Sequence, residues 1–430
     1  MAPDTSAMPL NFGIGQPVTR SEDPRHLTGG GNYTDDSNLD NQLYARFVRS
    51  QVAHGEINFV DISTAECLPG VIAIYTGADL RADNVGNIPS GLPLKNRDGS
   101  PYIVPPRTGL ATDRVRHVGD PIAVVIAETA LQAQEAVEAV KVDLSPLPVV
   151  VDAEKAIKAD APQLHDEAPG NVCLDFFVGD DDGIEKAFSE AAHITKMRID
   201  NTRIVVNAME PRSVIGEYDS ENEKFTVHMP TQGVMGVKGV LSKAIFKVDP
   251  EKVRVISNDV GGSFGMKGAA FVEPISVLYA ARKLDRPVKW TADRSESFIA
   301  DHQGRDSIIY AELALSADGE FLGLKVTGVG NCGAYLTAMG PAPMTNVICR
   351  NIISVYKTPA FSYSTKAVFT NTVPTGPYRG AGRPESKYIM EQLVDKAARE
   401  MGIDRVELRR RNLISPSAMP YSSPNGQKYD

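Results

Sequence analysis

A short glycine-rich stretch contains the residue types needed to bind an anion or a cofactor. Asp259–Lys267 reads DVGGSFGMK and follows the apolar alternating run 253–258. Glycine accepts positive φ angles and, because it has no Cβ atom, lets backbone N–H groups approach a ligand closely. This stretch, called the glycine loop below, therefore predicts a ligand site. The alternative is a β-bulge or a hairpin turn, in which glycine is equally common.

A second unusual stretch lies more than a hundred residues later. Pro374–Glu385 reads PTGPYRGAGRPE, with three glycines, three prolines and two arginines in twelve residues. Proline and glycine at this density exclude regular structure, so a loop is predicted. We call it the arginine loop. Taken alone, it is interpreted equally well as a surface loop with solvated arginines or as a binding loop.

Hydrophobic periodicity predicts an α+β chain around these loops. A turn followed by a strand is expected at 114–127, and strands are expected at 44–48, 71–75, 140–143, 194–199, 213–217, 225–228, 253–258, 307–315 and 322–330. Helices are expected from 76, and at 130–140, 183–192, 233–246, 273–284 and 386–401. Residues 12–33 are expected to form an extended arm, and residues 89–106 a long loop. The glycine loop lies between a strand and a helix, where helix N–H groups would favour an anion.

Length and composition indicate a globular protein of at least two domains. The 430 residues exceed one ordinary core, and a proline break predicts an N-terminal arm and domain at 1–155 and a second domain at 160–430. The net charge of −9 disfavours nucleic acid and anionic membranes as partners. No apolar run approaches a membrane span, and the N-terminus shows no export signal, so a cytoplasmic location is expected.

Several kinds of site are disfavoured by residue spacing. The four cysteines, Cys67, Cys173, Cys332 and Cys349, are far apart and include no C-x-x-C pair, which argues against zinc or iron–sulfur ligation and for reduced thiols. The seven histidines are scattered, so no metal held by protein ligands is expected. Neither a Walker A nor a G-x-G-x-x-G fingerprint is present, which disfavours ordinary nucleotide binding.

The order of the motifs resembles the molybdenum-cofactor-binding large subunit of the xanthine dehydrogenase and aldehyde oxidase family, the molybdenum hydroxylases. The resemblance covers essentially the whole chain. It rests on GQPVTRSEDPRHLTGGGNYTDD, GVIAIYTGADL, VGDPIAVVIAE, NAMEPR at 207–212, PTQ at 230–232, the glycine loop, RPVKW and PYRGAGRPE. It implies an α/β hammerhead domain followed by the first half of the molybdopterin-binding mixed α/β region.

The resemblance also implies roles for individual residues. Gln232 matches a glutamine whose side chain approaches the apical oxygen of molybdenum; the alternative is a loop amide bonded to backbone. Phe264 matches a residue whose backbone N–H binds the same oxygen, and Arg379 an arginine whose main chain lies beside the metal. The remaining cofactor-binding residues implied by the two loops are Gly261, Gly262, Ser263, Gly265 and Gly380.

The implied activity is hydroxylation of an aldehyde or an N-heteroaromatic carbon, with water as the source of oxygen. The implied cofactor is molybdopterin with molybdenum, its cytosine dinucleotide form included as a candidate. The family's general base is a glutamate in a segment beyond Asp430. We therefore expect a split subunit, as in nicotinate dehydrogenase-like enzymes, with a second molybdopterin-binding chain, a [2Fe-2S] subunit and a candidate FAD subunit as partners. A truncated single-chain large subunit is the alternative.

Departures from the family pattern narrow the substrate. Xanthine-oxidising members have a glutamate where this chain has Gly268, and carbon monoxide dehydrogenases have a cysteine where it has Gly380. Their arginine near Val347 would align with Arg350 only across a gap. Purines and carbon monoxide are therefore disfavoured, and the small Ala381 leaves room for an aldehyde or a pyridine carboxylate. Two other classes remain open: a non-catalytic scaffold with this fold, and a phosphate- or nucleotide-binding module.

Overall fold

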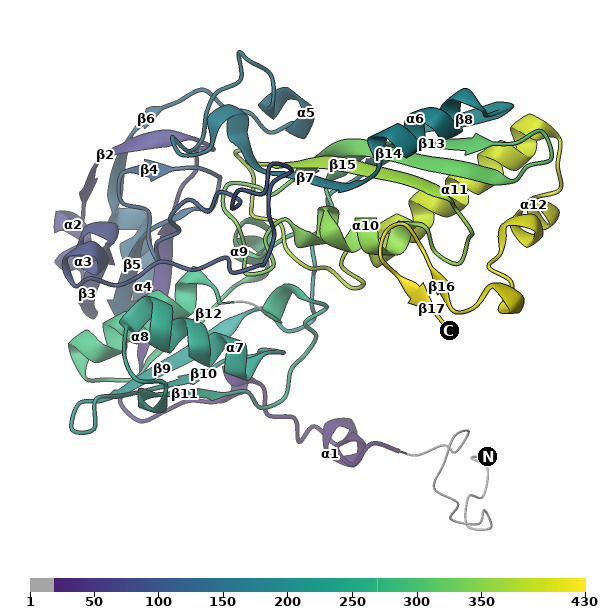
Figure 1. Cartoon of the computed structure of the whole chain (residues 1–430). Helices are drawn as coiled ribbons and strands as arrows, with labels where there is room; N and C mark the ends of the chain where they lie inside the picture. The colour runs from purple at the N-terminus through teal and green to yellow at the C-terminus, as the bar shows by residue number, and fades with distance from the viewer. Residues whose placement is uncertain (1–18, 269) are drawn as a thin grey trace, which may run out of the picture.

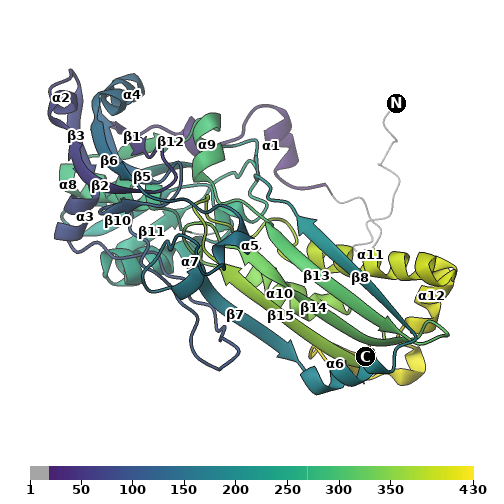
Figure 2. The same ribbon diagram turned by 90° about the horizontal axis from the view of Figure 1, so that it is seen from above.

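The structure, a computed structural model, describes residues 19–268 and 270–430. The chain forms two parts, each built on its own sheet (Figure 1). One part contains a seven-stranded and a three-stranded sheet, and the other a five-stranded sheet covered by long helices. The view from above in Figure 2 shows the same separation. The predicted mixture of strands and helices is therefore confirmed as a mixed α/β fold.

The seven-stranded sheet combines strands from distant parts of the sequence. Within this sheet, β1 pairs in parallel with β12 and antiparallel with β5. Helix α8 packs on β9 and β12, and its buried face shares one apolar core with the strands. The strands, in spatial order, are β11 (Val253–Ile256), β10 (Lys224–His228), β9 (Ser213–Asp219), β12 (Val288–Thr291), β1 (Leu43–Arg49), β5 (Pro121–Ala127) and β3 (Val71–Thr76). The sheet thus joins the chain on both sides of the predicted boundary between 155 and 160.

The three-stranded sheet lies beside it and belongs to the N-terminal segment. Its order is β4 (Arg114–Val115), β2 (Gly55–Asp61) and β6 (Lys141–Pro146). Helix α4 (Ala130–Ala139) begins after Thr129, whose hydroxyl accepts a hydrogen bond from Gln132 N, and packs on β1 and β5. The other helices of this segment are α1 (Asp23–Leu27), α2 (Ser63–Glu66), α3 (Gly77–Ala82) and α5 (Ala153–Ala156).

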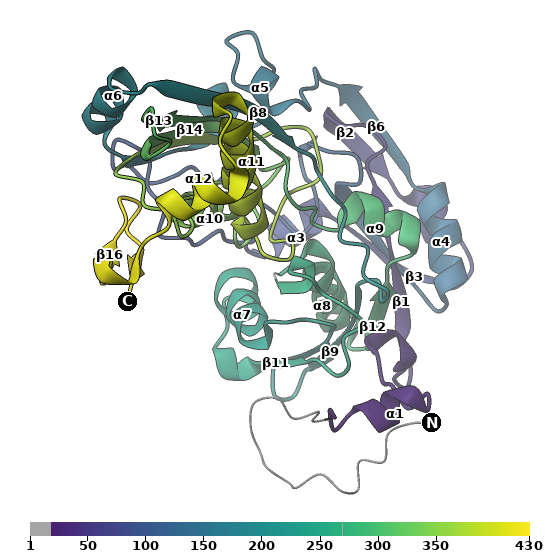
Figure 3. The same cartoon turned by 90° about the vertical axis from the view of Figure 1, so that its right-hand side faces the viewer.

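The five-stranded sheet supports the second part of the molecule. Its order is β7 (Val172–Gly179), β15 (Ala360–Val368), β14 (Phe321–Asn331), β13 (Ser307–Leu315) and β8 (His193–Asn201). The long helix α11 (Arg383–Met401) places Ile389 and Leu393 in the same apolar core as these strands. Figure 3 shows α10 and α11 in this part and α7 and α8 in the other. The remaining elements are α6 (Asp181–Ser189), α7 (Val234–Gly239), α8 (Val272–Leu284), α9 (Arg294–Ala300), α10 (Asn346–Ile352), α12 (Arg405–Asn412), β16 (Tyr421–Ser422) and β17 (Lys428–Tyr429).

Two local predictions were wrong. The arm expected to be extended contains the short helix α1, which starts with Pro24 near its first position, where the missing N–H costs nothing. Residues 12–18 of the expected arm lie outside the described residues. The helix expected over 233–246 is α-helical only to Gly239 and continues as a π-helix over Val240–Phe246. Within the described part of the chain, no helix is long and apolar enough to cross a membrane.

Candidate functional site

The two unusual loops meet at one cavity. The backbone N–H of Arg379 in the arginine loop donates to the carbonyl oxygen of Phe264 in the glycine loop, at 2.9 Å. The cavity has a volume of about 500 Å³. Its lining residues are Gln232, Phe264, Gly265, Pro377, Tyr378, Arg379, Gly380, Ala381 and Arg383. Five of the predicted site residues are therefore brought together here, whereas Gly261, Gly262 and Ser263 lie beside the cavity and do not line it.

The glycine loop adopts a backbone that few residues tolerate. Gly262 and Gly265 have φ angles of +101° and +103°, and between them Phe264 has a φ of +50°. A bulky residue in this region is an outlier, which is common at binding sites. A Cβ atom at Gly265 would lie 2.6 Å from the carbonyl oxygen of Pro377. Glycine is thus required at 265 for the two loops to touch.

The side chain of Gln232 is held by the glycine loop in one orientation. Its Oε1 atom accepts hydrogen bonds from Gly265 N, at 3.0 Å, and from the Ser263 hydroxyl. The alternative interpretation of Gln232, a loop amide bonded to the backbone, therefore holds for its Oε1 atom. Its Nε2 amide and the backbone N–H of Phe264 have no hydrogen-bond partner among the described residues. The loop thus leaves two donors available, from Gln232 and Phe264.

An ion pair that sequence reasoning missed lies behind the glycine loop. Lys267 is fully buried, and its Nζ atom is 2.7 Å from Glu210 Oε2. Burial lowers the pKa of Lys267, although Glu210 favours its charged form. The signal that could have found this pair is the glutamate of NAMEPR at 207–212, a motif that carries two charges in a segment otherwise suited to burial.

A buried network of charged residues surrounds Glu273 in the first turn of α8. Arg212 donates to Glu273 Oε1 at 3.0 Å and to Asp301 at 2.5 Å, and Arg49 donates to Glu273 at 2.9 Å. Burial alone would raise the pKa of Glu273, but the two arginines outweigh it and lower this pKa to about 2. Glu273 lies in the first turn of α8, so the protein's own carboxylate is located at the helix N-terminus where an anion was expected.

The arginine loop is held by Arg305, a residue that sequence reasoning also missed. The Arg305 guanidinium donates to the carbonyl oxygen of Arg379, at 2.9 Å, and to Glu385 at 2.6 Å. It also lies 5.1 Å from the ring centroid of Tyr378. Gly382, with a φ of +94°, ends the loop as the N-cap of α11. Nothing in the sequence around Arg305 signals this contact, because the two segments are about 75 residues apart.

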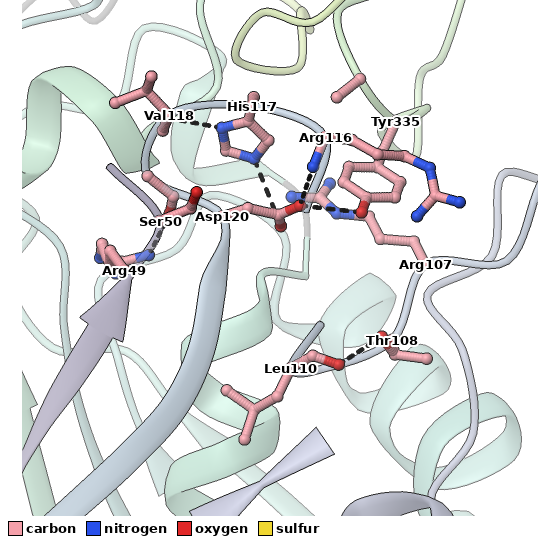
Figure 4. A network of polar contacts seen from close by, with 12 residues as sticks. Arg49, Ser50, Arg107, Thr108, Leu110, Arg116, His117, Val118, Asp120 and Tyr335 are labelled. Carbon is pink, nitrogen blue, oxygen red and sulfur yellow. Dashed lines mark hydrogen bonds and ion pairs between the residues drawn. The ribbon is translucent and has the colours of Figure 1, made fainter. Parts of the chain in front are cut away.

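A further polar network joins the N-terminal segment to the second part of the chain (Figure 4). The Asp120 carboxylate accepts hydrogen bonds from the Tyr335 hydroxyl, at 3.0 Å, and from Arg116 N, at 2.9 Å. His117 lies beside it, with its Nε2 atom 3.6 Å from Asp120. Nearby, Arg107 contacts His302 at 3.0 Å. Burial lowers the pKa of His302 well below its usual range, and Arg107 lowers it further, so His302 is the neutral acceptor.

Fold and cavity together define the class of the protein: a mixed α/β chain that presents backbone and amide donors to a ligand. Residues 164–413 match the family described as "Molybdopterin cofactor-binding domain". Residues 28–148 match the family described as "Aldehyde oxidase and xanthine dehydrogenase, a/b hammerhead domain". The chain therefore belongs to the aldehyde oxidase and xanthine dehydrogenase family, as a molybdopterin-binding large subunit. Among the described residues, no group of three or more His, Cys, Asp or Glu could hold a metal ion directly.

Similar proteins support this assignment. The chain is 33% identical to the nicotine 6-hydroxylase large subunit of Paenarthrobacter nicotinovorans, over 97% of this chain and 50% of that one. It is 27% identical to the nicotinate dehydrogenase large molybdopterin subunit of Eubacterium barkeri, over 92% of this chain and 88% of that subunit. Quinoline 2-oxidoreductase from Pseudomonas putida 86 superimposes with a TM-score of 0.90 at 31% identity, over 96% of this chain and 51% of that chain. The chain thus spans about half the length of the first of these relatives.

Proposed function

We propose that this chain is the molybdopterin-binding subunit of a multi-subunit molybdenum hydroxylase that acts on an aldehyde or an N-heteroaromatic carbon, with water as the source of oxygen. The observation that carries the proposal is the shared cavity, where the Gln232 amide and the Phe264 N–H are two free donors within the described residues. In the family these two groups face the oxygen ligand of molybdenum. The proposal extends this role to Gln232 and Phe264 here.

The residues of the cavity fit the cofactor on structural grounds. The backbone is left-handed at Gly262, Phe264 and Gly265. Because the two glycines have no side chain, they do not obstruct the approach of a ligand to the backbone N–H groups of the loop. Fixing the Gln232 oxygen through Ser263 and Gly265 directs its Nε2 amide away from the loop. When bound, the molybdenum cofactor supplies the redox centre and activates water. The chain itself contributes binding, orientation and hydrogen-bond donors.

The cavity wall also bears on the substrate. Arg379 and Arg383 are among its lining residues, and neither forms an ion pair with a carboxylate within the described part of the chain. Their positive charge favours a substrate or cofactor group that is acidic, such as the carboxylate of a pyridine carboxylate. The glycines at 268 and 380 occupy positions where enzymes for xanthine and carbon monoxide carry other residues. Similarity to subunits named for nicotine, nicotinate and quinoline supports an N-heteroaromatic.

We further propose that cofactor binding, the catalytic glutamate and electron transfer are distributed over several chains. The coverage of 88% of the nicotinate dehydrogenase subunit, against 50% of the nicotine 6-hydroxylase subunit, supports a second molybdopterin-binding chain that carries the catalytic glutamate. A [2Fe-2S] subunit would carry electrons away, with an FAD subunit as a further candidate, and the cytosine dinucleotide form is a candidate for the cofactor. We retain the division at 1–155 and 160–430, whose segments share the seven-stranded sheet.

The test uses the complex purified with its partner chains. Elemental analysis is expected to find molybdenum in the parent complex, and a complex that assembles without molybdenum would favour a scaffold. Gln232→Ala is expected to lower turnover about 10–100-fold without unfolding the complex, since it removes a group that orients the metal centre. Gln42→Ala is the matched control, because Gln42 Oε1 also accepts from a backbone N–H, that of Leu39 at 3.2 Å, away from the cavity. Unchanged turnover in Gln232→Ala would remove its assigned role.

A further inference from the structure

We propose that Glu210 and Lys267 are positioning residues: their buried ion pair sets the orientation of the Gln232 amide and of the glycine loop. This inference rests on the proposed function, because it concerns how the cofactor-facing donors are held. Neither Glu210 nor Lys267 lines the cavity. Each acts through backbone atoms of the loop that does.

Lys267 makes two contacts through its side chain. Its Nζ atom donates to the carboxylate of Glu210, at 2.7 Å, and to the carbonyl oxygen of the same residue, at 2.8 Å. The side chain is 0% exposed, whereas lysine is almost never fully buried without a partner. Its position in the loop is therefore fixed by Glu210 and not by water.

Glu210 also forms hydrogen bonds with Gly261, near the N-terminal end of the glycine loop. Its Oε2 atom accepts a second hydrogen bond, from Gly261 N at 2.8 Å, and its own N–H donates to the carbonyl oxygen of Gly261 at 3.1 Å. A Cβ atom at 261 would lie 2.5 Å from the Cβ of Glu210, so this contact also requires glycine. One carboxylate oxygen thus ties the first glycine of the loop to Lys267, six residues later.

The backbone of Lys267 carries this constraint to Gln232. The carbonyl oxygen of Lys267 accepts from Gln232 N, at 3.3 Å, and from the Thr231 hydroxyl, at 2.8 Å. The side chain of Gln232 returns to the loop through Gly265 N. A series of contacts therefore runs from Gly261 through Glu210, Lys267 and Gln232 to Gly265, and the ion pair is its charged member.

The physical chemistry of buried charges favours a positioning role. Removing two charges from water costs roughly what their attraction returns, so a buried ion pair is weak evidence for stability. What the pair does supply is direction, because each charged hydrogen bond has one favourable geometry. The other carboxylate oxygen, Glu210 Oε1, is buried with no partner within the described residues.

The test compares variants in the purified complex with its partner chains. Lys267→Met is expected to lower kcat about 10–100-fold while KM changes less than about threefold, the size seen when a group that orients a metal ligand is lost. The electron paramagnetic resonance spectrum of the partly reduced complex is expected to change shape, because the donors to the metal centre move. Molybdenum content is expected to stay above about half of the parent value.

Lys289→Met is the matched control. Lys289 is another buried lysine that donates to backbone carbonyls, those of Asp35 at 2.7 Å and Ser37 at 2.9 Å, and it does not line the cavity. It is expected to lower the melting temperature of the complex but to leave kcat and the resonance spectrum unchanged. An equal loss of kcat in both lysine variants would show a general structural effect and overturn the inference.

A second variant keeps the inference testable if Lys267→Met fails to assemble. Glu210→Gln retains an oxygen that can accept from Gly261 and Lys267, and it is expected to lower kcat a few-fold with an altered spectrum. Parental kcat and spectrum in Glu210→Gln or in Lys267→Met would overturn the inference. Failure of the proposed function is distinguishable, because the parent complex would then contain no molybdenum.

Discussion

The glycine loop and the arginine loop form one cavity but are held in different ways. The glycine loop is fixed from within, by its own Lys267, which pairs with Glu210 beneath it. The arginine loop is fixed from outside, by Arg305, which donates to the carbonyl oxygen of Arg379. The cation of the first pair, Lys267, is 0% exposed, whereas the cation of the second, Arg305, is 12% exposed.

Both loops nevertheless use the same backbone device. Each places a residue other than glycine in the left-handed region, Phe264 at φ +50° and Ala381 at φ +45°, next to glycines with positive φ. Such strain persists only where surrounding contacts over-determine it. The comparison teaches that the strained turns form the cavity, while the clamps decide how firmly each turn is held. The glycine loop, which carries the free donors, has the tighter clamp.

The largest effect is expected where the loops touch. Gly265→Ala would combine an unfavourable φ of +103° with a Cβ atom 2.6 Å from the Pro377 carbonyl oxygen. Left-handed strain and overpacking together are expected to lower the free energy of unfolding by about 3 kcal/mol. Chemical denaturation and molybdenum content of the complex measure the result, and both are expected to fall.

Gly402→Ala separates strain from contact. Gly402 ends α11 with a φ of +67°, and a Cβ atom there meets no atom within 4 Å. This variant is expected to lose only about 1 kcal/mol, from strain alone, with full molybdenum content. Equal losses in Gly265→Ala and Gly402→Ala would mean that contact between the loops contributes nothing.

An intermediate effect is expected from the outer clamp. Arg305→Met removes the donors to the Arg379 carbonyl and to Glu385, whose carboxylate is buried. Loss of these charged hydrogen bonds is expected to lower the free energy of unfolding by about 2 kcal/mol. Turnover is expected to fall less than in Lys267→Met, because the arginine loop presents no side-chain donor that is fixed by Arg305.

The control for the outer clamp is an ion pair remote from the cavity. Arg409 donates to Glu391 at 2.7 Å on the helices α11 and α12. Arg409→Met is expected to cost about 1 kcal/mol or less and to leave turnover unchanged. If Arg305→Met reduces turnover as strongly as Lys267→Met does, the two clamps are equivalent and the contrast between the loops fails.

The sequence predicted individual helices and strands better than it predicted which strands pair in the sheets. Alternation in 253–258 and 307–315 and helical periodicity in 386–401 led to β11, β13 and α11, because local patterns of burial set these elements. The pairing of β1 with β12 could not be read, since no local signal brings residues about 245 apart together. The π-helix after Gly239 also has no signature in the apolar pattern.

The same distinction applies to the site. Both loops were visible, because glycine and proline mark backbone that regular structure cannot accommodate. The contact between Glu210 and Lys267 was not visible, because the two residues lie in separate motifs and only the fold brings them together. The pairing of Glu273 with Arg212 could not be predicted for the same reason, because the two residues lie 61 positions apart.

The smallest effect on stability, and the sharpest test of the glycine loop, is expected at Gly268. A Cβ atom there would make ordinary contacts with the Gln232 side chain, 3.4 Å from Cγ and 3.7 Å from Nε2. Gly268→Ala is therefore expected to change the free energy of unfolding by less than about 0.5 kcal/mol. It is expected to change kcat/KM a few-fold, because the new methyl group packs against the amide that we propose faces the cofactor. Gly236→Ala, where a Cβ atom meets nothing within 4 Å, is the control. If neither variant changes kcat/KM, this face of the Gln232 amide does not reach the reacting ligand, and the tighter clamp on the glycine loop serves no catalytic purpose.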